Sequence, residues 1–207
     1  MRADAQRNLN AILTAARESF AAGGLEVGVA DIAKRAGVGT ATVFRRFATK
    51  DDLICAVCEQ SVAEMAERVA AAEAADDPWE GLRECMRAAI EMQVTDRGLC
   101  EALSRGIEAY PAVREAHDAL VARLAVLVRR AQEEGHLRAD LEPIDLPIVL
   151  NAVARAGAEL EPIAPGAWRR YFQMLLDALR PGAPPLEVPA PTREQVDAAF
   201  AGEQGAR

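Results

Sequence analysis

The sequence predicts an all-α protein of about nine helices, with a small three-helix unit at the N-terminus and a larger helical body. The chain is rich in Ala, Leu, Glu and Arg, which favour helices, and the period-two alternation of strands is almost absent. Proline is missing before Pro78 and then occurs mostly where helices are expected to begin or end.

Charge is distributed unevenly along the 207 residues. The chain has 24 Lys and Arg against 32 Asp and Glu, a net charge of −8, which argues against a general nucleic-acid coat protein. Residues 1–50 nevertheless carry eight basic and only four acidic side chains. A basic N-terminal block on an acidic body indicates a local anionic partner.

The composition also bears on the cellular compartment. Four cysteines in a chain of this length do not indicate a disulfide scaffold. The first residues lead into no apolar signal core, and no apolar run approaches the roughly 20 residues that a membrane span needs. We therefore expect a cytoplasmic protein that has no membrane partner.

Four helices are expected in the first third of the chain. Two short helices, near residues 29–36 and 40–47, lie between two long ones. Thr49 followed by Asp52 indicates a capping box that opens the second long helix, over about residues 50–75. The first long helix covers about residues 4–22, ends at Gly23-Gly24, and has an apolar face formed by Leu9, Ile12, Leu13, Ala16 and Phe20.

Five further helices are expected in the body, near residues 79–94, 99–106, 111–134, 144–160 and 165–179. Five prolines between Pro181 and Pro191 then predict an extended linker, after which Thr192 could cap one last short helix. The chain is thus divided into an N-terminal domain at 1–49, a helical body at 50–180, and a Pro-rich linker and tail at 181–207.

The stretch from Val29 to Lys50 is the most informative part of the sequence. Two short helices meet through a turn that contains Gly37, which is the helix-turn-helix arrangement. On the second helix, hydroxyl and guanidinium side chains suited to phosphates and base edges in the major groove face outward; these are Thr40, Thr42, Arg45 and Arg46. An ordinary helical hairpin with solvated arginines is the alternative that the pattern leaves open.

Three segments around this turn resemble the N-terminal domain of the TetR/AcrR family of bacterial transcriptional regulators. They are Phe20 to Gly24, Asp31-Ile32-Ala33-Lys34-Arg35-Ala36-Gly37-Val38, and Ala41-Thr42-Val43-Phe44-Arg45-Arg46-Phe47-Ala48-Thr49-Lys50-Asp51-Asp52-Leu53. Two segments of the body resemble the SbtR-type branch of the family: Asp77-Pro78-Trp79 and Asp96-Arg97-Gly98-Leu99. The resemblance implies that residues 1–49 bind DNA and that residues 50–180 bind a ligand and dimerise.

The resemblance also implies which residues contact DNA. Thr42, Phe44, Arg46 and Lys50 fall where the family contacts the DNA backbone, and Thr40, Ala41 and Arg45 fall where it meets bases or their flanks. The chain departs from the family pattern at three positions. Gly28 stands where a Thr is frequent, Gly39 where a Ser is frequent, and Phe44 where a Tyr is usual.

A helix-turn-helix unit gains specificity by pairing over two half-sites, so we expect a homodimer. The last two large helices of the body offer the apolar faces for dimerisation, and the corresponding helices form a four-helix bundle in the family. Burial of these faces within one chain is the alternative. The interface candidates are Val149, Val153, Ala156, Leu160, Trp168, Phe172, Leu175 and Leu179.

The resemblance places a small-molecule pocket in the body, at about residues 78–134. Polar side chains on otherwise apolar stripes and large apolar side chains are the candidates for its lining. Each also has a simpler interpretation: the apolar residues as core, His117 as an interface histidine, and Arg155 as the partner of Glu159. The candidates are Trp79, Met86, Ile90, Gln93, Cys100, Tyr110, His117, Asn151 and Arg155.

The sequence offers no catalytic constellation and no metal site, so we expect neither an enzyme nor a cofactor. Cys55 and Cys58 lie within a predicted helix without a second ligand pair, which favours simple packing. The favoured function is a dimeric repressor that a small molecule releases from a palindromic DNA operator. The alternatives are a ligand-independent DNA-binding regulator and a helical protein-interaction module without a DNA role.

Overall fold

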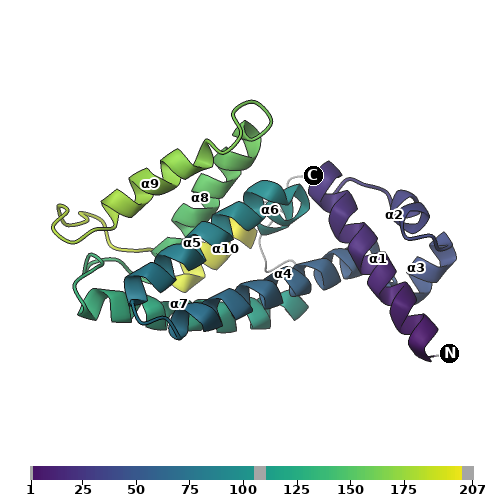
Figure 1. The fold of residues 1–207 in the computed structure, drawn as a ribbon, viewed down its shortest axis with the longest axis horizontal. Helices are drawn as coiled ribbons and strands as arrows, with labels where there is room; N and C mark the ends of the chain where they lie inside the picture. The colour runs from purple at the N-terminus through teal and green to yellow at the C-terminus, as the bar shows by residue number, and fades with distance from the viewer. Residues whose placement is uncertain (1, 105–110, 202–207) are drawn as a thin grey trace.

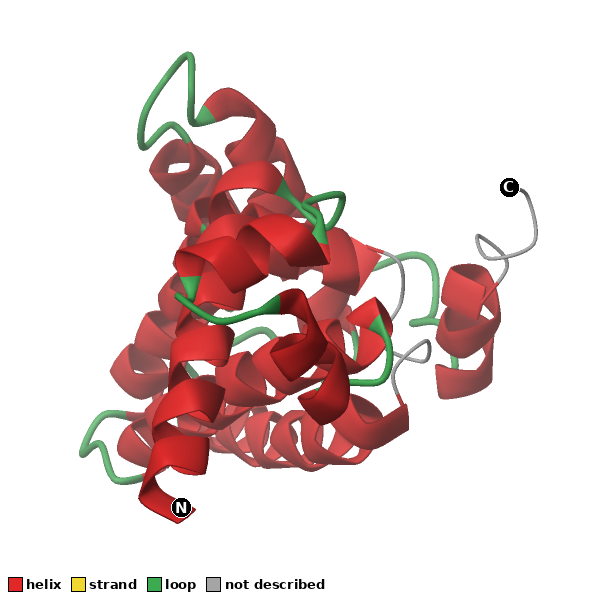
Figure 2. Ribbon diagram, turned by 90° about the vertical axis from the view of Figure 1, so that its right-hand side faces the viewer, coloured by secondary structure: helices red, strands yellow, loops and turns green. Residues whose placement is uncertain are grey.

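The computed structural model describes residues 2–104 and 111–201, and the all-α prediction is confirmed. This part of the chain contains ten helices and no strand, so the final short helix joins the nine that were expected (Figure 2). The helices are α1 (Arg2–Gly23), α2 (Val29–Arg35), α3 (Thr40–Arg46), α4 (Lys50–Glu73), α5 (Pro78–Thr95), α6 (Arg97–Ser104), α7 (Pro111–Glu133), α8 (Asp145–Leu160), α9 (Trp168–Ala178) and α10 (Arg193–Ala201).

The molecule is elongated, with a small head formed by α1, α2 and α3 at one end and the body at the other (Figure 1). The long helix α4 runs from the head into the body, where it packs against α5 and α7. Helix α5 also packs against α8, and α6 packs against α1 of the head. None of the helices within the described ranges is long and apolar enough to cross a membrane.

Local sequence signals account for the helix ends around the head. Gly37 has a φ of +68°, which lets the chain leave α2 through two hydrogen bonds, from Gly37 N to Lys34 O and from Val38 N to Ala33 O. These two bonds form a Schellman motif. The predicted capping box of α4 is confirmed, because Asp52 N donates to Thr49 Oγ1 at 3.1 Å and Thr49 N donates to Asp52 Oδ2 at 2.9 Å.

Two hydrophobic clusters hold the fold together, and α4 contributes to both. Leu53 and Val57, in its first half, pack with the buried side chains of α1, α2 and α3 and form the head cluster with them. Val69 and Ala72, near its end, pack with the body. The predicted boundary at residues 49/50 therefore falls at the start of a helix that is shared by head and body, and α4 joins them through apolar packing.

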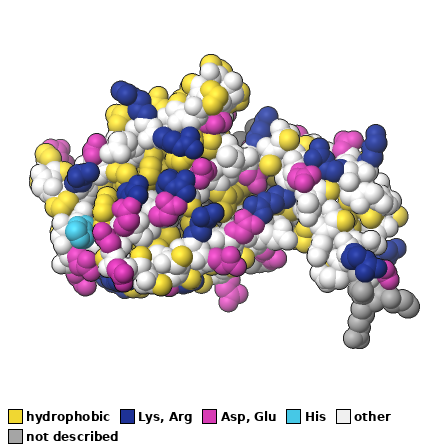
Figure 3. Space-filling model, in the orientation of Figure 1, with side chains coloured by type: hydrophobic (Ala, Val, Ile, Leu, Met, Phe, Trp, Pro, Cys, Tyr) yellow, Lys and Arg dark blue, Asp and Glu magenta, His cyan; other side chains and the backbone are white. Residues whose placement is uncertain are grey.

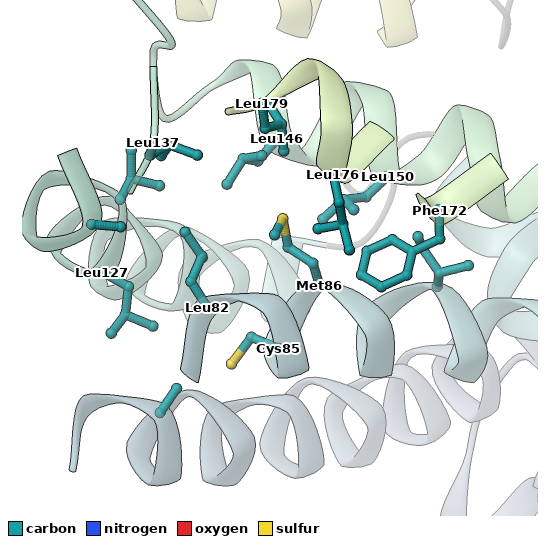
Figure 4. Packing of buried hydrophobic residues seen from close by; sticks show 14 of the residues in the cluster. Leu82, Cys85, Met86, Leu127, Leu137, Leu146, Leu150, Phe172, Leu176 and Leu179 are labelled. Atoms are coloured by element: carbon teal, nitrogen blue, oxygen red, sulfur yellow. The ribbon is translucent and has the colours of Figure 1, made fainter. Parts of the chain in front are cut away.

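The body cluster is formed by facing sides of α5, α7, α8 and α9 (Figure 4). Met86 on α5 lies among leucines of α8 and α9, with Phe172 beside it (Figure 4). Two glycines allow the helices to approach closely. A Cβ at Gly81 would lie 2.8 Å from Ala72 O on α4, and a Cβ at Gly157 would lie 2.7 Å from the Cβ of Trp168 on α9.

The Pro-rich segment after α9 is fixed to the body by Arg138 and Asp140. The Arg138 guanidinium, whose side chain is only 10% exposed, pairs with Asp140 and donates to Pro184 O at 2.6 Å. Asp140 Oδ2 accepts the backbone N–H of Leu186 at 2.8 Å. The hydrogen bond from Arg138 lowers the pKa of the Asp140 carboxyl. Further along the tail, Arg193 of α10 forms an ion pair with Asp118 of α7 at 2.8 Å.

Candidate nucleic-acid interface

Helix α3 divides into a buried side and an exposed side. Val43 is 1% exposed and Phe47, just after the helix, is 9% exposed; both pack into the head cluster. The exposed side carries the residues predicted to contact DNA: Thr40, Ala41, Phe44, Arg45 and Arg46 are exposed, and Thr42 and Lys50 are half-buried. The structure therefore brings all seven candidates to one end of the head.

Within the part of the chain that the structure describes, no acidic side chain neutralises the cations of this surface. Among the described residues, Arg45, Arg46 and Lys50 form no ion pair. Elsewhere in the head, Arg35 pairs with Glu18 at 3.2 Å. Basic side chains are visible at the outer edge of the head in Figure 3. A surface with three uncompensated cations attracts a polyanion, and the hydroxyls of Thr40 and Thr42 can donate hydrogen bonds to it.

The two glycines at the starts of the motif helices provide no side-chain cap. Gly28 precedes α2 and Gly39 precedes α3, and both have extended backbone geometry. Thr42 N donates to Gly39 O at 2.8 Å, so the first turn of α3 is held by backbone contacts alone. A serine at position 39 would add a side-chain acceptor for this turn.

Charged side chains at the junction position the head on the body. Arg17 of α1 pairs with Glu64 of α4 through two hydrogen bonds, of which Nη2 to Oε2 measures 2.7 Å. The hydrogen bond from Arg17 lowers the pKa of Glu64. Asp96 caps α6 by accepting the Leu99 N–H at 2.9 Å, and burial raises the pKa of its carboxyl.

Helix α6 reaches the head at the turn after α1. Glu101 Oε2 accepts a hydrogen bond from the backbone N–H of Leu25 at 2.8 Å, and Glu101 Oε1 accepts one from Arg97 Nε at 2.8 Å. A Cβ at Gly98 would lie 2.5 Å from the Cβ of Phe20, so only glycine allows α6 to lie this close to α1. A displacement of α6 would therefore act directly on the end of α1.

The predicted dimer interface is only partly available to a second chain. Trp168 and Phe172 on α9, and Leu179 directly after it, are at most 5% exposed and belong to the body cluster, so the alternative of intramolecular burial holds for them. Leu175 is half-buried against the same cluster. On α8, Ala156 is exposed, and the other three candidates, Val149, Val153 and Leu160, are half-buried.

The outer apolar flank of α9 was not among the predicted interface residues. Tyr171 is 40% exposed and Met174 is 59% exposed, while Ile163, in the turn between α8 and α9, is 84% exposed. Hydrophobic side chains are visible on the surface around these two helices in Figure 3. The spacing of Tyr171, Met174 and Ala178 was a detectable signal, since it places a second apolar stripe beside the buried one.

The predicted pocket residues are brought into the body, but not around one open site. Met86 and Ile90 are at most 1% exposed in the packed core, and Gln93, 6% exposed, donates to Ala89 O of its own helix at 3.2 Å. Cys100 is buried, whereas Trp79, His117 and Asn151 are half-buried. Tyr110 lies outside the described residues.

Arg155 faces solvent on α8, and the alternative interpretation of it as the partner of Glu159 does not hold, because among the described residues these two exposed side chains form no ion pair. Two hollows on the surface are lined by other residues than the candidates. One lies between α4 and α5 beside Gly81, and the other lies between α1 and α2 beside Ser19.

The cysteines pack as expected. Cys58 is buried in the head cluster and Cys55 is half-buried against it. Burial raises the pKa of the Cys58 thiol to about 12 and that of Cys85 to about 11. Such thiols are protonated at neutral pH and react slowly. Within the described ranges, His, Cys, Asp and Glu form no cluster that could hold a metal ion.

Two short helices joined by a glycine turn, with an exposed cationic face on the second, define a helix-turn-helix protein of the DNA-binding class. Comparisons with known proteins give the family. Residues 12–57 match the family described as bacterial regulatory proteins, tetR family, and residues 77–181 match the C-terminal domain described as transcriptional regulator SbtR-like. The chain belongs to the TetR family of transcriptional regulators.

Solved structures agree with this assignment. A TetR transcription regulatory protein from Mycobacterium vanbaalenii is 32% identical over 86% of this chain and 98% of its own, with a TM-score of 0.60. A TetR transcriptional regulator from Streptomyces coelicolor is 30% identical over 84% of this chain and 99% of its own, with a TM-score of 0.63. The regulator FadR from Bacillus subtilis, solved in complex with stearoyl-CoA, shares the fold at 15% identity over 82% of this chain and 96% of its own, with a TM-score of 0.66. No curated protein matches the chain.

Proposed function

We propose that this protein is a homodimeric repressor that binds a palindromic DNA operator in the cytoplasm and is released from it by a small molecule. The observation that carries the proposal is the exposed side of α3, where Arg45, Arg46 and Lys50 have no acidic partner among the described residues. The overall charge of −8 would repel DNA, so binding must be confined to this surface.

DNA is the polyanion that fits a short exposed helix. The major groove admits an α-helix, and its base edges accept hydrogen bonds from arginine. We assign Arg45, at the centre of the exposed side, to bases, with Ala41 and Thr40 beside it. Thr42, Arg46 and Lys50 are assigned to phosphates, which fix the register of the head on the duplex.

Dimerisation through α8 and α9 would place two heads on one duplex. Its support is the apolar flank of these helices, on which Ala156, Tyr171 and Met174 are exposed and Val149 and Leu160 are half-buried. Met174→Glu is expected to give a monomer in sedimentation equilibrium, because it adds a charge to this flank. Gln173→Glu adds the same charge on the polar flank of α9 and is expected to leave the dimer intact. If Met174→Glu were a dimer as well, α8 and α9 would not form the interface.

Release by a ligand requires that the ligand prefer one arrangement of the two heads. The close seating of α6 on α1 supports this part of the proposal, because it connects the body directly to the head. The regulator FadR from Bacillus subtilis, which shares the fold, was solved in complex with stearoyl-CoA. The packed positions of Met86 and Ile90 imply that core side chains of this chain would move to admit a ligand.

Fluorescence anisotropy on DNA from upstream of the protein's own gene tests the proposal. Wild type is expected to bind this DNA tightly and a scrambled duplex weakly. Arg45→Ala with Lys50→Ala should lose most of that affinity, while Arg129→Ala, which removes an exposed cation of the body, should retain it. If the first double variant bound as tightly as wild type, the proposal would be wrong. Small molecules are then added one at a time to the complex, and a fall in anisotropy identifies the one that releases DNA.

A further inference from the structure

The exposed side of α3 carries an apolar spot among its polar and charged groups. The Phe44 ring is 48% exposed, and the Ala41 side chain, three residues earlier, is exposed next to it. Val43 and Phe47 point the other way, into the head cluster, so the exposed part of the Phe44 ring does not contribute to the packing of the core. Covering this ring with an apolar group of a partner is favourable by the hydrophobic effect.

The charges around the spot restrict the partner. Arg45 follows Phe44 directly, and Arg46 and Lys50 lie beyond it, none of them in an ion pair within the described part of the chain. A partner that covers all of these groups must be anionic around an apolar centre. A hydrophobic protein surface would leave three cations desolvated and unpaired, which is costly.

The major groove of DNA meets both requirements. Phosphates line its edges, and the C5-methyl of thymine is the apolar group that it presents on a base edge. The resemblance places Phe44 where the family contacts the DNA backbone, but Phe44 has no hydroxyl with which to bond a phosphate, so the contribution of its ring to binding is apolar. We propose that Ala41 and Phe44 select thymine in each half-site by covering its C5-methyl group. This inference rests on the proposed DNA-binding function and adds a base preference to it.

The test removes the methyl group from the DNA and leaves the protein unchanged. Duplexes enriched from a random-sequence pool by the wild-type protein give the binding site, which is then synthesised with thymine or with deoxyuridine. Wild type is expected to bind the deoxyuridine site about threefold to fourfold more weakly for each methyl that it covers. Deoxyuridine placed only in the flanking DNA is expected to have no effect, which controls for changes in DNA shape.

Protein variants assign the effect to the ring. Phe44→Ala is expected to bind thymine and deoxyuridine sites equally, whereas Phe44→Tyr, which keeps the ring, should retain the preference. Arg46→Ala should bind both sites more weakly with the wild-type preference unchanged. Equal binding of both sites by wild type, or an unchanged preference in Phe44→Ala, would overturn the inference while leaving DNA binding itself intact. Failure to enrich any duplex would overturn the proposed function, and this inference with it.

Discussion

Gly37 fixes the turn between the two motif helices, and its replacement by alanine isolates the cost of that turn. Gly37 has a φ of +68°, in the left-handed region that side chains disfavour. A Cβ at this position would have no neighbour within 4 Å. The substitution therefore introduces backbone strain without a steric clash, so its effect on stability reports the conformation alone.

The expected loss follows from two opposing contributions. The left-handed conformation costs an alanine about 1–2 kcal/mol relative to the right-handed one. Alanine also lowers the conformational entropy of the unfolded chain, which stabilises the folded state by about 0.4–1 kcal/mol. We therefore expect Gly37→Ala to lower the free energy of unfolding by about 1 kcal/mol, or Tm by roughly 2–4 °C for a protein of this length.

Thermal and urea unfolding, followed by far-ultraviolet circular dichroism, provide the assay. The matched control is Gly39→Ser, two residues along the same turn, where φ is −73° and a Cβ again meets nothing within 4 Å. Serine is the better N-cap, so this variant should gain a few tenths of a kcal/mol. Wild-type stability in Gly37→Ala, or an equal loss of stability in both variants, would refute the expected cost of the left-handed backbone at this position.

Three further predictions concern the head and its junction with the body. Asp96→Asn should stabilise the protein at pH 7 in urea unfolding, and the asparagine still caps α6. Burial raises the pKa of Asp96 in the folded state, so wild type loses stability as the pH rises from the unfolded-state pKa through the folded-state pKa. A gain in stability that persists unchanged at pH 3 would contradict this prediction. Glu101→Ala leaves the Leu25 N–H without its acceptor and should cost about 1–3 kcal/mol in the same assay, and an unchanged midpoint would exclude a role for this contact. Cys58, whose pKa is raised to about 12 by burial, should be alkylated by iodoacetamide at pH 8 only after unfolding, as peptide mass mapping would show; modification in the native protein would disprove its burial.

Much of the head could be predicted from the sequence because its signals are local. Gly37, the Thr49–Asp52 capping box and the buried positions Val43 and Phe47 each act within a few residues. Such signals have a fixed geometry, so the spacing of residues along the chain translates directly into structure. The exposed side of α3 then follows by elimination.

The body was predicted less completely because its contacts join residues distant in sequence. Helix α9 has two adjacent apolar stripes, and the helical period alone does not tell which one faces the core. Trp168 and Phe172 proved to be core, and Tyr171 and Met174 were left exposed. The contact of Glu101 with Leu25 spans 76 residues and involves a backbone N–H, which carries no sequence signature.

The salt dependence of DNA binding tests most directly whether the exposed side of α3 is the DNA-binding surface. Each phosphate contact that is lost should reduce the slope of log K against log salt concentration by about 0.9. In the proposed dimer, which carries Lys50 twice, Lys50→Ala should therefore reduce the slope by about 2, whereas Arg129→Ala on the body should leave it at the wild-type value. Equal slopes for wild type and Lys50→Ala would show that this surface does not contact the phosphates.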